Sequence, residues 1–586
     1  MESEAAVRTM LGAVTYRGRD EVIRPLVGAT LGLRLSSGLE SVESQVFVDE
    51  AGGLLLCAGS VMGSSDGSSG GSSGGSSGGS ASTLRDRLRR GDFLGLDGAF
   101  AACHYDVGRR TLTLLRDPFG QRAVFYALRG EVLYFASELK QLLALAELPV
   151  ALDPLAIHAY LTFSFVPGEA TPISGVSRLP PGHRLTFKGG RIEVEPYFAL
   201  EERLIEIAPA DAAQHLRRLS KAAVERRLGA KSAALALSGG LDSSAVGLWL
   251  KTAGVPVTAF TLDFGAASVE REEARETAAF LGFPQVLVPA DPAAILEHLD
   301  TLVWHLDMPF GDGVTGPQWL LAKAVREAGF ETLWNGEGGD QLFGGWTSKP
   351  MVAAAVFGTA DELSLEEQYL RSYHRFYGLE GRLYGPDLAA SVSPGLRRGF
   401  IARFLGDERQ TAFLNRVRLT DISLKGSQNI LPRAGRMAAA HGLSVQMPLF
   451  DRALAEWSFT LPPALKLHGS CEKYVMKLAL QNRLPKEIVW RRKFGMSVPL
   501  TDWMFGALRP AMEERLSETA VSSRGLFQPE YVRELRLGKD VASETRRRRL
   551  GERLWALLVL ETWCRLFVDG RGRPVAVPGV GAGGAP

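Results

Sequence analysis

The sequence has few cysteines, no long apolar run and almost no net charge. Its four cysteines lie far apart in 586 residues, a spacing that favours neither a disulfide framework nor a zinc site. No apolar run reaches the ~20 residues that a membrane-spanning helix needs, and the acidic residues Glu2 and Glu4 stand where a signal peptide is basic. The net charge of +2 gives no electrostatic reason to expect nucleic-acid binding. We therefore expect a cytoplasmic protein whose partners include neither a membrane nor nucleic acid.

The length and the pattern of the remaining residues predict more than one globular domain. Helical periodicity begins near Asp153 and dominates beyond Ala208, where short strands such as residues 257–262 and 332–334 alternate with helices. This alternation predicts a parallel, doubly wound α/β sheet. The first part of the chain is rich in strands, which we expect at residues 44–48, 53–58, 99–105, 111–116, 123–128 and 132–136.

Three further segments have a biased composition. Residues 63–82 are a regular Gly/Ser repeat, which indicates a flexible linker in place of a native loop, either engineered or natural. The Gly/Pro-rich tail at 570–586 is expected to be disordered. An arginine run at 546–549 leads into an apolar-faced helix at 554–567, and it is interpreted as a solvated helix face rather than a binding patch.

Residues 235–244, LALSGGLDSS, have the composition of a pyrophosphate-binding loop. The apolar run 233–237 suits a buried parallel strand, and residues 243–250 have helical spacing. Between them, Gly239 and Gly240 permit close backbone approach and present amide N–H groups to an anion at a helix N-terminus. The alternative is a Ser/Gly turn that only caps a helix. A Walker A loop is excluded, because no Gly-Lys-Ser/Thr follows the glycines.

Carboxylates accompany this loop and a second Gly-rich segment. Asp242 would repel a phosphate unless a metal lay between them, so we expect Mg²⁺ at this position. The segment 334–346, WNGEGGDQLFGGW, also follows a short strand and contains Glu337 and Asp340. Asp340 is the expected second Mg²⁺ ligand, and Glu337 is a candidate to orient or deprotonate an attacking amine. The alternative for this segment is an acidic surface loop.

Together these segments resemble the asparagine synthetase family over nearly the whole chain. The motifs that resemble its N-terminal glutaminase domain are LDGAF (96–100), RDPFG (116–120), FASELK (135–140) and LPPGH (179–183). The motifs that resemble its synthetase domain are EKY (472–474), LP (484–485), RKFG (492–495), Pro499 with Trp503, and the terminal stretch 554–563. The resemblance implies an α+β, Ntn-hydrolase-like sandwich over residues 1–205. Over residues 206–569 it implies a doubly wound parallel α/β ATP-pyrophosphatase domain with helical additions.

The resemblance also implies the ligands and the residues that hold them. ATP and Mg²⁺ are the expected cofactors. Lys493 is expected to stabilise charge that develops during adenylation or amide formation. Without the family motif around it, its basic neighbours would indicate an exposed surface lysine. The residues expected to hold pyrophosphate are Ser238, Gly239, Gly240, Asp242, Ser243 and Ser244. The residues expected to meet the rest of the nucleotide are Leu237 and Leu262, through their backbone at the adenine, and Asn335 with Gly336.

The chain departs from the family at the glutaminase nucleophile. Family glutaminases begin with Met-Cys-Gly, and here Leu11 stands at the cysteine position, between Met10 and Gly12. Cys57 lies in an apolar run and is expected in the core. Without the thiol no ammonia is released from glutamine. The N-terminal domain is therefore expected to be a structural remnant or a surface for other contacts.

A second departure concerns the acceptor. Within residues 433–451, Gly435 and Ser444 replace family carboxylates and Gln446 replaces an arginine. A small zwitterion would lose the partners of its charges there, so a larger and less charged acceptor fits better.

These features predict a lasso peptide cyclase, an enzyme that adenylates an Asp or Glu side chain of a precursor peptide. The peptide's own N-terminal amine would then close a macrolactam, with release of AMP and pyrophosphate. The expected partners are the precursor peptide and, as further candidates, a leader peptidase and a leader-binding protein. The alternatives are a β-lactam synthetase-like cyclase of a small amino-acid derivative and an ammonia-dependent asparagine synthetase. A catalytically silent scaffold is the alternative outside the enzymes.

Overall fold

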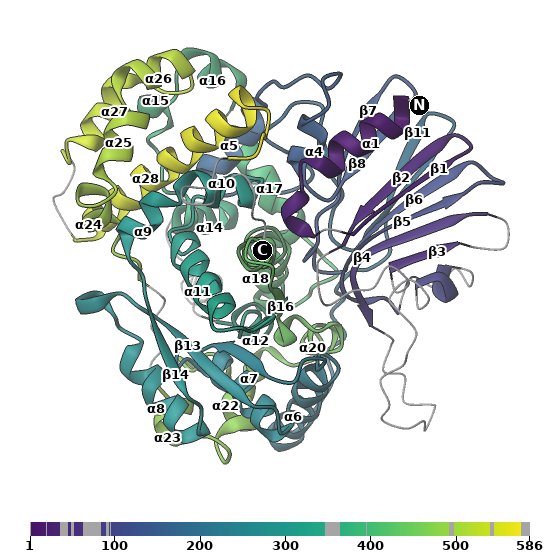
Figure 1. Cartoon of the computed structure of the whole chain (residues 1–586). Coiled ribbons are helices and arrows are strands. Elements are labelled where there is room, and N and C mark those ends of the chain that lie inside the picture. The colour runs from purple at the N-terminus through teal and green to yellow at the C-terminus, as the bar shows by residue number, and fades with distance from the viewer. Residues whose placement is uncertain are drawn as a thin grey trace. The chain divides into compact units, whose positions relative to one another are not determined.

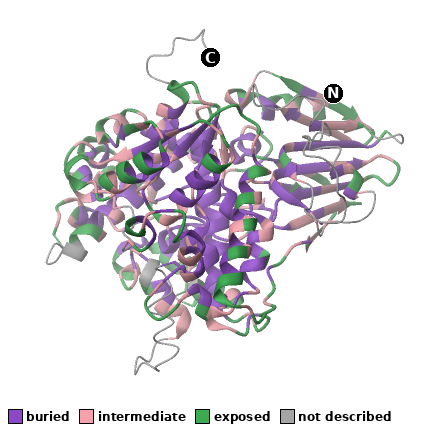
Figure 2. Cartoon of the chain, turned by 90° about the horizontal axis from the view of Figure 1, so that it is seen from below, coloured by how far each residue is buried: buried purple, intermediate pink, exposed green. Residues whose placement is uncertain are grey.

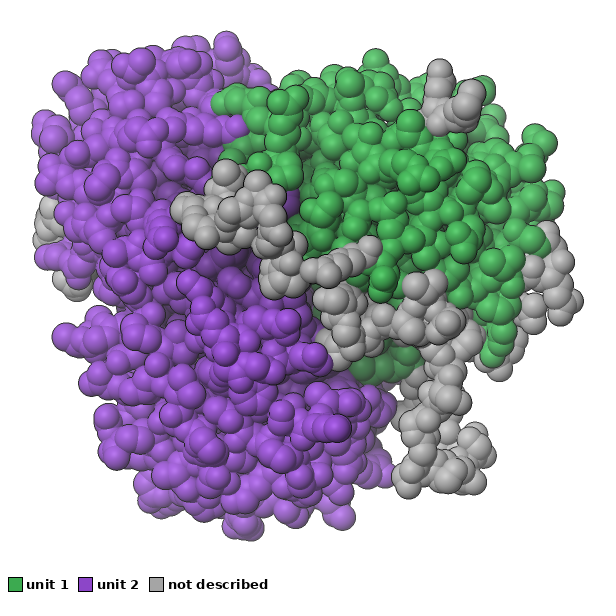
Figure 3. All heavy atoms as spheres, viewed as in Figure 1, with its two compact units in different colours: residues 1–151, 168–199, 566–586 green, residues 152–167, 200–565 purple. Residues whose placement is uncertain are grey.

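The computed structural model describes residues 2–18, 20–35, 45–48, 52–62, 84–88, 93, 95–345, 364–393, 395–491, 497–539 and 544–575 (Figure 1). The chain forms two compact units, shown in Figure 3. Unit 1 comprises residues 1–151, 168–199 and 566–586, and unit 2 comprises residues 152–167 and 200–565. The predicted linker at 63–82 and the tail from 576 onward lie outside the described residues. The predicted domain boundaries stay a prediction.

Unit 1 is built from antiparallel sheets. Its six-stranded sheet has the order β11-β10-β6-β5-β4-β3, its three-stranded sheet the order β8-β7-β9, and β1 pairs with β2. The strands are β1 (Glu21–Leu26), β2 (Ala29–Arg34), β3 (Val46–Val48), β4 (Leu54–Met62), β5 (Asp97–Asp106), β6 (Thr111–Arg116), β7 (Phe125–Arg129), β8 (Val132–Ala136), β9 (Ser177–Arg178), β10 (His183–Lys188) and β11 (Arg191–Pro196). Its helices are α1 (Glu2–Gly12), η1 (Thr15–Arg17) and α4 (Leu139–Leu143).

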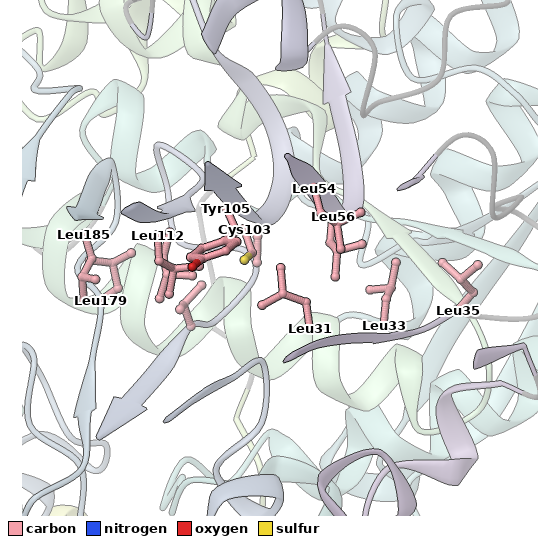
Figure 4. Close-up of a cluster of buried hydrophobic side chains, with 13 residues drawn as sticks. Leu31, Leu33, Leu35, Leu54, Leu56, Cys103, Tyr105, Leu112, Leu179 and Leu185 are labelled. Atoms are coloured by element: carbon pink, nitrogen blue, oxygen red, sulfur yellow. The ribbon is translucent and has the colours of Figure 1, made fainter. Parts of the chain in front are cut away.

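The core of unit 1 lies between two layers of strands. Leu31 and Leu33 of β2 point toward Leu54 and Leu56 of β4 and toward Tyr105 of β5 (Figure 4). β4 and β5 each contain four consecutive buried residues, because both faces of these strands are covered: Leu54 and Leu56 belong to one buried cluster, and Leu55 and Cys57 belong to another. The expected N-terminal sandwich is therefore present.

Unit 2 contains a five-stranded sheet with the order β14-β13-β12-β15-β16, and every neighbouring pair is parallel. The strands are β12 (Ala233–Ala236), β13 (Val257–Asp263), β14 (Gln285–Pro289), β15 (Thr332–Trp334) and β16 (Ser444–Gln446). The chain proceeds from central β12 toward β14 and then crosses to β15 and β16 on the other side. The order therefore reverses beside β12, which confirms the predicted doubly wound sheet and places a topological switch point at its carboxyl end.

Helices surround this sheet and extend beyond it (Figure 1). The helices in the first part of unit 2, up to residue 343, are α5 (Pro154–Phe163), α6 (Pro209–Glu225), α7 (Leu241–Thr252), η2 (Gly265–Ala267), α8 (Arg271–Leu281), α9 (Pro292–Glu297), α10 (Leu299–Leu306), α11 (Thr315–Glu327) and α12 (Gly339–Phe343). Those in the next part of the chain are α14 (Leu365–Tyr373), α15 (Glu380–Leu383), α16 (Pro386–Ser391), α17 (Leu396–Leu405), α18 (Phe413–Thr420), α19 (Leu431–Ala439), η5 (Pro448–Phe450), α20 (Arg452–Ser458) and α21 (Pro463–Lys466). The last are α22 (Tyr474–Leu480), α23 (Lys486–Val489), α24 (Leu500–Phe505), α25 (Arg509–Arg515), α26 (Glu518–Arg524), α27 (Pro529–Arg536), α28 (Glu544–Trp563) and the short π-helix Cys564–Asp569.

A ten-residue π-helix, Asp421–Ile430, connects α18 directly to α19. π-Helical segments of this length are rare and are frequently found at functional sites. Helices in the interior of unit 2 are largely buried (Figure 2). Within the described part of the chain, none of the helices combines the length and apolar character that crossing a membrane would require.

Candidate active site

The two Gly-rich motifs meet at the carboxyl ends of neighbouring strands. The loop after β12 leads into α7, and the loop after β15 leads into α12. A Cβ atom added to Gly336 would lie 2.5 Å from the backbone nitrogen of Ser243, so only a glycine fits at this crossing. The fold therefore brings together two motifs that are about a hundred residues apart in sequence, at the switch point where doubly wound sheets bind ligands.

The loop after β12 is held in shape by its own hydroxyls. Ser244 Oγ donates to the carbonyl of Gly240 over 2.7 Å, and the Gly240 amide donates to Ser238 Oγ over 3.2 Å. Gly239 has a φ of +72°, and a Cβ there would lie 2.3 Å from the Glu273 carbonyl carbon. Gly240 directly precedes α7, so the positive end of this helix faces the loop. This geometry suits an anion.

Lys473 holds the two predicted metal-binding carboxylates together. Its Nζ lies 2.5 Å from Asp242 Oδ2 and 2.5 Å from Asp340 Oδ1. Burial disfavours the charged amine, but the two carboxylates outweigh burial and raise the pKa of Lys473 above its ordinary value. The two carboxylates thus converge on one cation.

The residues present fit a Mg²⁺ ion that keeps phosphate oxygens among its ligands. Such a site uses one or two carboxylates rather than a full protein cage. Asp242 and Asp340 supply two that reach a common point. Among the described residues, no group of three or more His, Cys, Asp and Glu side chains has metal-binding geometry, so a cage made by protein alone is not found there.

Glu337 lies between these carboxylates and a set of cations. Burial raises its pKa, Asp340 and Asp242 add to the increase, and Arg433 and Lys425 act against it. The net effect is a pKa above the ordinary value of a glutamate. A carboxylate with a raised pKa is a stronger base, so Glu337 is suited to accept a proton from an amine.

Asp312 and Arg433 form an ion pair beside Glu337. Arg433 Nη1 lies 2.6 Å from Asp312 Oδ2. Burial opposes ionisation of Asp312, but Arg433 and Lys425 outweigh it and lower the pKa of Asp312 to about 2. Asp312 is therefore a fixed negative charge near neutral pH, and it cannot act as a base there.

These residues line one cleft of about 440 Å³ within unit 2. The lining includes Leu237, Leu262 and the loop 238–243, together with Asp312, Lys425 and Arg433. Leu321, Ala322, Ala434, Met437, Ala438 and Val445 contribute apolar wall. A cleft of this size is within the range of small-molecule binding sites.

Most of the predicted site residues lie in or beside this cleft. Asn335 Oδ1 accepts from the Glu337 amide over 3.1 Å, which fixes the turn after β15. The Leu237 amide donates to Phe260, and its carbonyl accepts from Thr261, so only the second lone pair of that carbonyl remains for a nucleotide. Lys493 lies outside the described residues. The assigned roles stay predictions.

The sequence analysis missed several residues that line the cleft. Lys473 lay inside a family motif, and Asp312 lies in a Gly-rich acidic turn much like the two that were recognised. Arg491 Nη1 donates to the carbonyl of Gly239 over 3.0 Å. The sequence around Lys425 and Arg433 does not indicate a role for them, because they act on the pKa values of Asp312 and Glu337, which lie on other elements.

The position of the missing nucleophile is filled by a core residue. Leu11 is 3% exposed and belongs to α1, so its backbone nitrogen is an amide within a helix. Its side chain packs beside Gly32 of β2. Cys57 is fully buried in β4. Neither residue offers a thiol together with a free amine.

The predicted acceptor segment forms α19 and β16. Gly435 lies in α19, and Ser444 and Gln446 are the ends of β16. The carbonyl of Gln446 accepts from the Asn335 amide over 3.1 Å, which fastens this segment to the second Gly-rich loop. The wall that it presents to the cleft is made of small or apolar residues and one cation, Arg433.

Comparisons with known proteins agree with this architecture. A family model described as asparagine synthase matches residues 215–565, and one described as a glutamine amidotransferase domain matches residues 92–198. "Asparagine synthetase [glutamine-hydrolyzing] 1" of Bacillus subtilis is 24% identical over 82% of this chain and 79% of its own length. "Amidase chyE" of Penicillium rubens is 31% identical over 43% of this chain and 40% of its own length. Because the first model spans more than half of the residues, the chain belongs to the asparagine synthase family, a family of ATP-dependent amide-forming ligases.

Proposed function

We propose that the protein is an ATP-dependent lasso peptide cyclase. It adenylates an Asp or Glu side chain of a precursor core peptide and closes a macrolactam with the peptide's N-terminal amine, releasing AMP and pyrophosphate. The observation that carries the proposal is the contrast between the two units. Leu11 is buried where the glutaminase cysteine is expected, whereas the cleft of unit 2 keeps its glycine loop, paired carboxylates and cations.

The acceptor side of the cleft favours a peptide over free aspartate. With Gly435, Ser444 and Gln446 in place of charged residues, the part of this segment that lines the cleft has no carboxylate and only Arg433 as a cation. The α-ammonium and α-carboxylate of a free amino acid would need a partner each, and burying either one unpaired is costly. A peptide-borne side chain has amide bonds in place of these charges, so it suits the apolar wall.

The residues of the cleft account for both chemical steps. In the first step a carboxylate oxygen bonds to the α-phosphorus, and the bond to the leaving pyrophosphate breaks. The amides of the loop 238–244 and the ammonium of Lys473 face the phosphates and favour their negative charge. When bound, Mg²⁺ would be held by Asp242 and Asp340 and would neutralise charge on the pyrophosphate.

In the second step the amine bonds to the activated carbonyl carbon, and AMP leaves with the oxygen that joined it to phosphorus. The attacking amine must lose a proton, and Glu337 is suited to accept it because its pKa is raised. Asp312, which is paired with Arg433, keeps a fixed negative charge next to Glu337. Lys493 is proposed to stabilise the charge on the α-phosphate and the acyl oxygen.

A second candidate is ammonia-dependent asparagine synthesis, because several relatives are named glutamine-hydrolyzing asparagine synthetases and this chain has Leu11 in place of the glutaminase cysteine. A direct comparison separates the two. The protein is incubated with ATP, Mg²⁺ and synthetic core peptides that carry a free N-terminus and an internal Asp or Glu. The expected product has lost one water molecule and contains an isopeptide bond in its fragment spectrum, with AMP formed in equal amount.

Parallel reactions contain aspartate with ammonium chloride in place of the peptides. ATP turnover there, and none with any peptide, would overturn the cyclase proposal. Asp242→Asn serves as the matched control, because it removes a charge from the pair held by Lys473 at nearly constant volume. We propose the precursor peptide, a leader peptidase and a leader-binding protein as the partners, and their effect on the rate can be measured in the same assay.

A further inference from the structure

A second cavity of about 160 Å³ adjoins the cleft at its acceptor end. We call it the side pocket. It shares Asp312, Val314 and Lys425 with the cleft, so the two cavities meet at these three residues. The rest of its lining comes from the end of α5 and the residues after it, the glycines beside Asp312, α14 and the residues after it, the π-helix, the start of α24 and α28. It lies within unit 2.

The lining of the side pocket is mixed, and apolar side chains form only part of it. Phe163 and Phe165 have ring centroids 5.9 Å apart, and Leu424 and Leu500 are buried beside them in the lining. An apolar cavity of ~150 Å³ is large enough to take a benzene ring. The side pocket is therefore large enough for one aromatic or branched side chain.

The backbone around the side pocket is tightly constrained. A Cβ added to Gly313 would lie 2.6 Å from a methyl carbon of Leu500, and one added to Gly311 would lie 2.6 Å from the Tyr160 hydroxyl. Ser164 ends α5 with a φ of +65°, a conformation that non-glycine residues rarely adopt. Its carbonyl accepts from the Gly311 amide over 2.8 Å. Such outliers tend to occur where a ligand is held.

Positive charge exceeds negative charge around the side pocket. Glu552 pairs with two arginines, Arg375 at 2.7 Å and Arg548 at 3.4 Å. At the opposite side Asp312 faces both Arg433 and Lys425. Each carboxylate thus faces two cations, so an additional carboxylate is attracted to this pocket.

We propose that the side pocket is a substrate subsite that takes an apolar side chain of the peptide together with a carboxylate on the same or an adjacent residue. The inference rests on the proposed peptide substrate. It adds that a residue of the peptide near the reacting Asp or Glu lies in the side pocket. The ring or branched chain packs against Phe163 and Phe165, and the carboxylate faces Arg375 and Arg548. The reacting side chain remains in the cleft beside Glu337.

The test uses N-acetyl-L-phenylalanine as a probe and measures its binding by ligand-observed NMR and titration. Two comparison probes test the contribution of the carboxylate and that of the ring separately. N-acetyl-L-phenylalanine amide lacks the carboxylate, and N-acetyl-L-alanine lacks the ring. We expect the first probe to bind most tightly and each comparison probe to bind more weakly. Equal affinity for all three probes would overturn the proposal.

Val498→Trp fills the side pocket from its partly exposed edge, and Val498 does not line the cleft. We expect the dissociation constant of the probe to rise about tenfold or more, since burial of a large apolar side chain is worth that much. Val286→Trp is the matched control, because Val286 is 39% exposed in β14 and lines neither cavity. Unchanged binding in Val498→Trp would contradict the assignment.

Arg548→Gln tests the charge separately, and its side chain is 60% exposed, so folding is not at risk. We expect this variant to lose most of the preference for the carboxylate probe over the amide probe. A preference that is unchanged would contradict the role of the arginines. None of these measurements requires turnover, so they can fail while the cyclase assay succeeds, or succeed while it fails.

Discussion

Lys473 Nζ lies 2.5 Å from Asp242 Oδ2, although 231 residues separate the two in the chain. The same nitrogen is equally close to Asp340 Oδ1. A metal ion that binds both carboxylates therefore competes with this ammonium for the same oxygens. Nucleotide binding changes the balance, because phosphates offer the ammonium new partners.

Lys473→Met is predicted to tighten divalent metal binding in the absence of ATP. Without the competing ammonium, Mn²⁺ affinity should rise about tenfold, equivalent to ~1.4 kcal/mol. Free Mn²⁺ measured by electron paramagnetic resonance reports the change. The rate of pyrophosphate release should fall at the same time, since the phosphates lose a cation. Lys477→Met is the control, because its Nζ lines the same cleft but lies 3.6 Å from Cys471 Sγ. Weaker Mn²⁺ binding in Lys473→Met would contradict competition.

Arg433→Gln is predicted to move the acid limb of the pH–rate profile to higher pH. Arg433 lowers the pKa of Glu337, so its removal lets that pKa rise further above the ordinary value. Glu337 must be ionised to accept a proton, so activity is then lost at a higher pH. The measurement is the single-turnover rate of macrolactam formation between pH 5 and pH 9, because Glu337 is proposed to act after pyrophosphate has left. Arg436→Gln is the control: Arg436 pairs with Asp307 at 3.2 Å, and the acid limb should stay in place. An acid limb that stays in place in Arg433→Gln as well would argue against Glu337 as the base.

Gly336→Ala is predicted to weaken ATP binding by more than it lowers stability. The added methyl group would lie 2.5 Å from the Ser243 nitrogen and would push apart the two Gly-rich loops. Overpacking of this kind costs ~1–3 kcal/mol. Isothermal titration with a nonhydrolysable ATP analogue and a thermal melt give the two quantities. Gly229→Ala is the control, because a Cβ at Gly229 meets no atom within 4 Å. Normal nucleotide affinity in Gly336→Ala would show that the contact between the loops is dispensable.

His441 is predicted to make the protein less stable at mildly acidic pH. Its ring packs 4.3 Å from that of Trp319, and burial, Lys323 and His298 lower its pKa to about 4. The unfolded state takes up a proton near the ordinary pKa of 6.5, whereas the folded state does not, so stability falls as the pH falls from about 6.5 toward 4. Between pH 7 and pH 5 this group should contribute a loss of up to ~2 kcal/mol.

The measurement is the free energy of unfolding in urea at the two pH values, for the wild type and for His441→Gln. The variant should lose less stability between pH 7 and pH 5 than the wild type does. An identical loss in both proteins would assign the acid sensitivity to other groups.

The parallel sheet could be predicted because its strands are short apolar runs next to glycine turns. Residues 233–237 and 257–262 match β12 and β13 within one residue at each end. The β1–β2 hairpin was not predicted, although Gly28 lies in its turn. Pro25 lies inside β1, and a proline weakens the sequence pattern of a strand. The π-helix has no sequence signature either, because its residues also suit an α-helix.

The candidate site was predictable where its residues are contiguous and not where they come together by folding. The serines and glycines of 238–244 belong to one turn, so their sequence alone indicates an anion. Lys473 joins Asp242 and Asp340 only through the tertiary structure. Likewise, Asp312 acquires its lowered pKa from Arg433 and Lys425, which are more than a hundred residues away. Long-range electrostatic partners of this kind cannot be deduced from local patterns.

The length of the π-helix Asp421–Ile430 determines which face the next helix, α19, turns toward the cleft. Each residue of an α-helix turns the chain by about 100°, and each residue of a π-helix turns it somewhat less. Deleting one residue from this segment would therefore rotate α19 by about a quarter of a turn relative to α18. Arg433 would then leave Asp312, and the apolar face of α19 would leave the cleft. A single-residue deletion between 421 and 430 should therefore be far more damaging than a substitution at the same place. The angular position of one helix is encoded in the length of the segment before it.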